Sequence, residues 1–387
     1  MADSYTEVTS KGWLSRIGES IKGIVFGLIV IPGMVVLLWW NEGRAVTTAN
    51  SLNEGASAVL EVAADKVDPA NNKKLIHVTG AATAPGPVAD PDLGLSFPVL
   101  RLERSEEIYQ WLEDSRSETK EKLGGGEETI TTYTYKKDWT GRPVDSSEFK
   151  DSATHVNNGE LIAGDTVITA ENVTLGAFEV PTDFVRDLGG EVQQALSSAD
   201  LAHLPDPLKA RAKLHKGAFL FADNPDAPQI GDSRITYQVV KPGTYSFVAA
   251  QIANTFEPYQ AKAGDAIRLI ESGTVSAELM FKNAHSANAM MTWIIRFLGF
   301  LIMAFGFMAV MRPLAVLGSV VPAIGNIIGL GTGLISFVLA ATISLLVIAI
   351  AWIVVRPLLG IALLALVIGG FLFTKKLAAK SNASAAV

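Results

Sequence analysis

The sequence contains no cysteine. It can therefore form no disulfide, no thiolate metal site and no cysteine nucleophile. Charged residues are scarce as well, because 18% of the 387 residues are Asp, Glu, Lys or Arg while 49% are hydrophobic. Soluble domains usually carry about 25% charged residues. We therefore expect a membrane protein, in which any water-facing domain is held together by apolar burial rather than by disulfides.

Signatures of catalysis are missing too. The five histidines are scattered, and none has a second histidine or a carboxylate at metal-ligand spacing. No G-x-S-x-G elbow, phosphate-binding glycine loop or H-E-x-x-H motif is present. We therefore predict no enzyme, no cofactor, and no catalytic or metal site. An envelope or lipid-acting enzyme is a lesser alternative, and its sign would be a polar pocket that pairs His155 or His215 with carboxylates.

The charges that are present are unevenly distributed. Residues 41–286 hold 36 Asp/Glu and 23 Lys/Arg, whereas the rest of the chain holds 3 acids and 9 bases. Basic residues beside apolar runs are typical of membrane insertion. The acidic middle segment excludes nucleic acid as a partner, and the apolar runs predict the lipid bilayer as one.

The first apolar run covers residues 23–40 and is bounded by charged residues on both sides. At 1.5 Å per residue it just crosses a hydrocarbon core of about 30 Å. It ends in Trp39 and Trp40 instead of a small-residue cleavage site, which favours a transmembrane helix over a signal peptide. Glu42 and Arg44 follow directly, at the predicted membrane surface.

Further runs predict three more spans, at residues 287–311, 334–355 and 357–374. The second span contains one charge, Arg296, close enough to its outer end for the long side chain to reach the headgroups. Arg356 separates the last two spans as the cap of a tight outer hairpin. The complete set of predicted membrane-interface anchors is Trp39, Trp40, Glu42, Arg44, Arg296, Arg312 and Arg356.

Residues 312–333 differ from the other apolar runs because they combine Pro313 and Pro322 with several glycines. This composition predicts a broken segment that lies in the interface or re-enters the membrane. Its small and polar residues are candidates for close helix packing or for lining a re-entrant loop. These candidates are Gly318, Gly325, Asn326, Gly329, Gly331 and Gly333.

Loop charge favours four spans over five. With four, the tails 1–22 and 375–387 are both cytoplasmic, and residues 41–286 form an extracytoplasmic or lumenal domain. A fifth span would leave Lys375, Lys376 and Lys380 outside, against the positive-inside rule. The predicted fold class is therefore an integral membrane α-helical protein with four spans and a large β-rich α+β domain between spans 1 and 2.

Within this domain, residues 106–135 allow two interpretations. The charges of residues 106–121 are compatible with a solvated helix. Alternating apolar residues, a turn at glycines 124–126 and the β-prone run 129–135 instead favour an antiparallel hairpin. We predict the hairpin, and a helix between residues 182 and 202. Further predicted strands are 75–80, 166–169, 173–180, 218–221, 234–240 and 245–252.

Several short motifs resemble the transmembrane protein 43 family, also called LUMA. No motif is specific alone, but their order and spacing extend over nearly the whole chain. They are residues 40–46, 64–69, 77–80, 107–111, 145–149, 175–178, 231–235 and 312–314.

The resemblance implies a four-span protein with a large lumenal domain. Eukaryotic members are found at the endoplasmic reticulum and inner nuclear membrane, where they are thought to organise membrane protein complexes, contact lamina proteins and self-associate. The family also has bacterial members, for which the implied location is the inner membrane with a periplasmic domain. No catalytic residues are implied by it.

Our functional prediction is a non-enzymatic, multi-pass membrane scaffold that self-associates and organises membrane protein complexes or envelope structure. The implied partners are the bilayer, further copies of the chain and other membrane proteins. A channel or channel subunit built on the glycine-rich 313–333 segment is the main alternative.

Overall fold

The computed structural model of the chain describes residues 3–355, 361–362, 365–366 and 369. These residues form two compact units. The domain unit comprises residues 1–7, 51–116 and 131–284, and the helix unit comprises residues 8–50, 117–130 and the chain from 285 onward. Two helices and three strands run from one unit into the other.

Three long helices account for the apolar runs: α1 (Trp13–Ala58), α5 (Ala277–Gly318) and α6 (Pro322–Val355). Each is long and apolar enough to cross a membrane. Each predicted span within the described part thus lies inside a longer helix. The predicted fourth span at 357–374, Arg356 and the tail 375–387 lie largely or wholly outside the described residues.

The glycine-rich segment predicted at 312–333 is not a separate element in the structure. Helix α5 continues through Pro313 to Gly318, and α6 starts again at Pro322. Pro322 opens α6, where a missing N–H breaks no helical hydrogen bond. Glycine weakens a helix less in an apolar environment, because no water competes for its backbone groups. The break predicted over the whole segment is therefore confined to residues 319–321.

The predicted hairpin is confirmed by the longest strands in the domain, β6 (Arg101–Glu121) and β7 (Glu127–Thr140). They belong to an eight-stranded sheet with the order β1-β7-β6-β14-β13-β12, in which β8 also pairs with β6 and β11 with β14. The other strands are β1 (Ser4–Lys11), β8 (Thr166–Thr169), β11 (Val192–Gln194), β12 (Lys213–His215), β13 (Ala218–Phe221) and β14 (Ser233–Val240).

A second sheet is centred on the antiparallel pair β3 (Leu75–Thr83) and β15 (Gly243–Ile252). Its order is β10-β9-β3-β15-β16, with β19 added to β15 and β2 added to β3 in parallel. These strands are β2 (Leu60–Ala63), β9 (Thr174–Leu175), β10 (Phe178–Glu179), β16 (Thr255–Glu257) and β19 (Leu269–Ser272). Two small ribbons complete the domain, β4 (Val88–Asp90) with β5 (Leu95–Phe97) and β17 (Tyr259–Gln260) with β18 (Ala266–Ile267).

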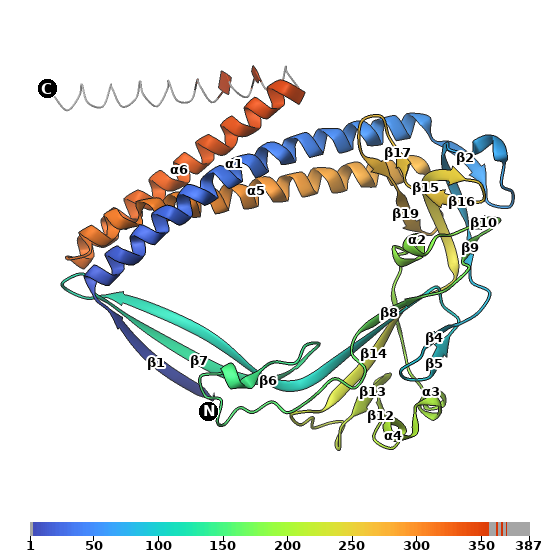
Figure 1. Cartoon of the computed structure of the whole chain (residues 1–387), viewed down its shortest axis with the longest axis horizontal. Helices are drawn as coiled ribbons and strands as arrows, with labels where there is room; N and C mark the ends of the chain where they lie inside the picture. Colours follow the sequence, from blue (N-terminus) through green and yellow to red (C-terminus); the bar gives the residue numbers. More distant parts are fainter. Residues whose placement is uncertain (1–2, 356–360, 363–364, 367–368, 370–387) are drawn as a thin grey trace. The chain divides into compact units, whose positions relative to one another are not determined.

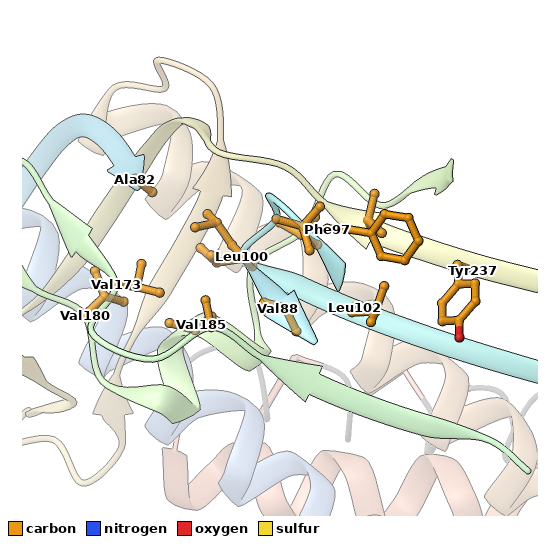
Figure 2. Packing of buried hydrophobic residues seen from close by; sticks show 14 of the residues in the cluster. Ala82, Val88, Phe97, Leu100, Leu102, Val173, Val180, Val185 and Tyr237 are labelled. Atoms are coloured by element: carbon orange, nitrogen blue, oxygen red, sulfur yellow. The ribbon is translucent and has the colours of Figure 1, made fainter. Parts of the chain in front are cut away.

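Figure 1 shows the strands of the two sheets. Side chains from both sheets form the main core of the domain unit. Figure 2 shows Ala82 of β3, Val88 of β4 and Leu102 of β6 within one buried cluster. Alternate residues of β6 are buried between Leu102 and Gln110, as expected for a strand with one face on a core. This burial accounts for a stable domain without disulfides.

The helix predicted between residues 182 and 202 is wrong. The structure has the short helix α2 (Thr182–Arg186), then β11, then α3 (Ser198–His203), and α4 (Asp206–Lys209) follows. Gly190 adopts a positive φ of 89°, which a continuing helix does not allow. The helical periodicity of this segment is therefore overridden by a glycine pair and by strand pairing of β11 with β14.

The tip of the β6–β7 hairpin contacts the start of α1. Nη2 of Arg16 lies 2.6 Å from Oε1 of Glu121. The sequence predicts residues 1–22 on the cytoplasmic side and residues 41–286 on the opposite side, and this sidedness stays a prediction.

Candidate functional site

The three long helices meet at a buried carboxylate. Glu42 of α1 is only 1% exposed. Its Oε1 accepts a hydrogen bond from Nε of Arg296 on α5 and its Oε2 one from Nη2 of the same guanidinium, both at 2.7 Å. The indole Nε1 of Trp352 on α6 donates to Oε2 at 2.6 Å. One carboxylate therefore joins all three helices.

A second set of hydrogen bonds extends this site along α1 and α5. Arg44 donates to Oδ1 of Asn288 at 3.0 Å and to Oγ1 of Thr292 at 3.1 Å. Asn41 donates to the carbonyl oxygen of Thr292 at 3.2 Å, and Asn288 donates to the carbonyl oxygen of Ala45 at 2.9 Å. We call these residues, with Glu42, Arg296 and Trp352, the inter-helix polar cluster.

Charged and cation–π interactions hold the helices together at this cluster. The Arg296 guanidinium packs against the rings of Trp293 and Trp352, with 4.7 and 5.4 Å to the ring centroids. A bidentate arginine–carboxylate pair combines charge with fixed geometry, and it strengthens where the surroundings are apolar. Because three donors already occupy the Glu42 carboxylate, it is not a free base. The arrangement connects the three helices through one carboxylate.

A cavity of about 330 Å³ lies beside the inter-helix polar cluster. Its wall contains Glu42 and Arg296 together with small residues of α1 such as Ala45 and Ala49. His285 and Trp293 of α5 complete the lining. The two charged residues in this wall already pair with each other, so the cavity offers no unpaired cluster charge to a ligand.

Close packing of α1 on α5 occurs at glycines that the sequence analysis did not single out. A Cβ added at Gly27 would lie 2.5 Å from the carbonyl oxygen of Gly306, and one at Gly23 would lie 3.2 Å from that of Ala309. Small residues at i and i+4 allow helix backbones to approach this closely. The G-x-x-x-G spacing of residues 23 and 27 was the signal that could have identified the contact.

We expect Gly27→Leu to separate α1 from α5, because no side chain fits against the Gly306 carbonyl. The matched control is Gly331→Leu in α6, where an added Cβ meets no atom within 4 Å. The measurement is a disulfide crosslink between single cysteines placed on α1 and α5 in native membranes. Equal crosslinking in the two variants would contradict the close contact.

The predicted membrane anchors occupy different surroundings. Trp39 and Trp40 are exposed on α1, as an interfacial position requires. Glu42 and Arg296 instead pair inside the helix layer, so the Arg296 side chain is not extended outward. Arg312 is exposed and borders an apolar groove of about 420 Å³ between the three helices. Whether these residues act as anchors stays a prediction.

The glycine-rich candidates are not gathered at one site. Gly318 and Gly325 pack closely across the α5–α6 turn, where a Cβ on Gly325 would lie 2.7 Å from Cα of Ser319. A Cβ added at Gly331 or Gly333 would meet no atom within 4 Å. Gly329 and Gly333 both line the apolar groove. Asn326 is exposed.

The two histidines named for the enzyme alternative lie in separate places. His215 and the carboxylates of Glu107 and Asp226 line a cavity of about 530 Å³ in the domain unit. Glu107 pairs with Arg234 at 2.5 Å, and His215 makes no side-chain hydrogen bond within the described part of the chain. His155 is buried and stacks on Tyr135 with 3.7 Å between ring centroids. Within residues 3–355 no group of three His, Cys, Asp or Glu residues forms a potential metal site.

Comparison with known proteins gives a consistent result over most of the chain. A family model described as Transmembrane protein 43 matches residues 108–357. The chain is 29% identical to "Transmembrane protein 43" of Mus musculus over 369 residues and to that of Homo sapiens over 372, covering 92% of this chain and 90% of each relative. It is 27% identical to "Transmembrane protein 43 homolog" of Drosophila melanogaster over 352 residues, covering 88% and 90%. No solved structure matches the chain.

Proposed function

Because this chain belongs to the transmembrane protein 43 family, we propose that it is a non-enzymatic membrane scaffold that self-associates and organises other membrane proteins. The observation that carries the proposal is the inter-helix polar cluster. It connects α1, α5 and α6 through Glu42, whose carboxylate is fully engaged by Arg296 and Trp352. Polar chemistry in the helix unit therefore serves a fixed arrangement of helices.

The outer surface of this arrangement supports self-association. Exposed apolar residues recur at helical spacing on α6, at Ile327, Leu330 and Leu334. Helix surfaces in lipid associate by van der Waals packing, so a regular apolar stripe suits a second copy of the chain. The acidic domain is a separate surface for partners of the scaffold.

Single-cysteine crosslinking tests self-association directly, because the chain has no native cysteine. We expect Leu330→Cys to form a covalent dimer on oxidation in native membranes. The matched control is Val192→Cys, which is exposed on strand β11 of the domain unit. Native mass spectrometry of the unmodified chain with its lipids should show more than one copy. A monomeric mass together with no Leu330→Cys dimer would refute the proposal.

The channel alternative has less support. The segment proposed to line a pore is divided between the end of α5 and the start of α6, and a Cβ added at Gly331 or Gly333 would meet no atom within 4 Å. Pores require polar groups or backbone carbonyls turned toward a shared path. The scaffold would act in the bacterial inner membrane if the source is bacterial, and at the endoplasmic reticulum or inner nuclear membrane if it is eukaryotic.

A further inference from the structure

The helix unit contains one isolated cation. Arg312 of α5 is the only charged residue between positions 297 and 355 of the sequence, and its side chain is exposed. Within the part of the chain that the structure describes, no residue forms a hydrogen bond or an ion pair with its guanidinium. An ionised side chain in so apolar a segment is costly unless it meets an anion. Arg312 therefore marks a place where an anion is expected.

Small residues of all three long helices line the apolar groove that Arg312 borders. Gly23 comes from α1, Ala309 from α5 and Gly333 from α6. Helices α1 and α5 are in close contact here, because a Cβ added at Gly23 would lie 3.2 Å from the carbonyl oxygen of Ala309. A Cβ added at Gly333 would instead meet no atom within 4 Å. The groove thus has open space beside α6.

The rest of the lining suits a hydrocarbon chain. Phe305 and Met308 lie about two turns and one turn before Arg312 on α5, and they are 61% and 36% exposed. Arg312 is the one charged residue among the described residues of the lining. The volume of about 420 Å³ is within the range of roughly 300–1,000 Å³ that small-molecule sites have. An apolar groove bordered by a single cation matches a ligand with an apolar chain and an anionic head.

Charges near the groove favour an anion as well. Lys22 directly precedes Gly23 on α1 and is exposed. The carboxylate of Glu19 interacts electrostatically with both Lys22 and Arg312, but it already forms an ion pair with Lys11 at 2.8 Å. Three cations and one acid therefore lie in this part of the helix unit. Their excess positive charge attracts a further anion.

The neighbouring parts of the chain offer Arg312 no carboxylate side chain. Residues 279–387 contain no Asp and no Glu. The predicted last span, residues 357–374, could cover an apolar groove but would leave the Arg312 charge without a partner. A second copy that packed its own α5 or α6 here would also bring no acid from residues 279–387. Charge complementarity thus favours a ligand from the membrane over either protein segment.

We propose that the apolar groove binds an anionic glycerophospholipid. Its phosphate interacts with Arg312 and Lys22, while one acyl chain lies against Phe305 and Met308 and beside Gly333. Basic pockets between transmembrane helices are a recurring type of site for anionic headgroups. The groove residues of α6 are not those of its exposed apolar stripe, so the lipid site does not depend on self-association.

Native mass spectrometry of the full chain in detergent tests the role of the charge. The delipidated protein is titrated with phosphatidylglycerol or with phosphatidylcholine of the same acyl chains, and phosphatidylglycerol should bind more tightly. Arg312→Gln should weaken phosphatidylglycerol binding about fivefold, as expected for one basic residue beside an anionic lipid. The matched control is Arg211→Gln, which removes an exposed arginine of the domain unit. Equal affinity for the two lipids, or for the two variants, would overturn the proposal.

A pair of glycine variants tests the groove itself. Gly333→Leu places a side chain in the groove, whereas Gly331→Leu adds the same side chain outside its lining. Both should fold, because an added Cβ meets no atom within 4 Å at either position. We expect only Gly333→Leu to lose phosphatidylglycerol binding. If Gly333→Leu kept the lipid, whether or not it lost self-association, the occupant would be a protein segment and the proposal would be wrong.

Photocrosslinking locates the bound lipid. Phosphatidylglycerol with a photoreactive acyl chain should label Phe305 and Met308, as identified by peptide mass spectrometry of the full chain. Unlabelled phosphatidylglycerol should suppress this labelling, and phosphatidylcholine should suppress it less. Ile327 and Leu330 of α6 are exposed to lipid without lining the groove, so they report non-specific contact. Labelling of these two residues without Phe305 and Met308 would overturn the site.

Discussion

Replacing Arg104 with methionine is expected to reduce the free energy of unfolding of the domain by roughly 3–5 kcal/mol, the usual cost of removing one partner from a buried ion pair. Arg104 is 1% exposed and Asp90 is 0% exposed. Both oxygens of Asp90 accept hydrogen bonds from Nη1 of Arg104 at 2.7 Å. Methionine fills most of the volume but leaves the Asp90 charge buried without its cation.

The rest of the site explains why so little can compensate for the loss. Arg104 also donates to Oδ2 of Asp92 and to the carbonyl oxygens of Ala163 and Gly164, all at 2.8–2.9 Å. Burial by itself lowers the pKa of Arg104, but the hydrogen bonds to Asp92 and Asp90 outweigh it and raise the pKa. Burial and the hydrogen bond to Asp90 raise the pKa of Tyr237, so its hydroxyl stays protonated as a donor.

The measurement is thermal unfolding of the full chain in nanodiscs, followed by near-ultraviolet circular dichroism. Arg234→Met is the matched control, because Arg234 also pairs with a glutamate of β6 but is about one-third exposed. An exposed pair contributes about 0–1 kcal/mol, so this control should unfold close to the unmodified chain. Equal shifts for both variants would show that burial of the Arg104 site does not determine its contribution.

The second large effect is expected in the helix unit, for Arg296→Leu. This change leaves the Glu42 carboxylate in an apolar layer with only the Trp352 indole as a donor. Removing one partner from such a pair costs roughly 3–5 kcal/mol. Contacts of Arg296 with the Trp293 and Trp352 rings are lost as well. We therefore expect early loss of helix packing on heating, measured by far-ultraviolet circular dichroism and by protease access to α6.

A double variant separates the ion pair from the volume change. Glu42→Leu with Arg296→Leu removes both charges, so it should be more stable than either single variant. Arg312→Leu is the control, since Arg312 is exposed and makes no hydrogen bond or ion pair with the described residues. If the double variant lost as much stability as the two single variants combined, the two charges would not be coupled.

Several elements were predictable because their signal is local. The β6–β7 hairpin is indicated by alternating apolar residues before three glycines and a β-prone run after them. Strands β8 and β13 were predicted with their observed bounds. The segment 182–202 was not predictable in the same way. Its helical periodicity is real, but pairing of β11 with β14 is a contact between residues distant in the sequence.

In the candidate site, too, only features that depend on neighbouring residues were predictable. Hydropathy and charge predicted Trp39, Trp40, Glu42, Arg44 and Arg296 as membrane-interface anchors, and that role stays a prediction. That Glu42 and Arg296 are partners was not recognised, because 254 residues separate them in the chain. The contribution of Trp352 and the close contact of Gly27 with Gly306 were missed for the same reason.

The sequence by itself determined the apolar runs, the acidic β-rich domain and the family, because composition, periodicity and motif order are properties of neighbouring residues. Only the tertiary structure decided which charges meet. It paired Glu42 with Arg296 inside the helix layer and Arg16 with Glu121 at the hairpin tip. Charge counting assigned Arg16 and Glu121 to opposite sides of a membrane, since it treats each charge separately. The structure brings the two side chains within 2.6 Å of each other, a contact that counting charges along the chain does not reveal.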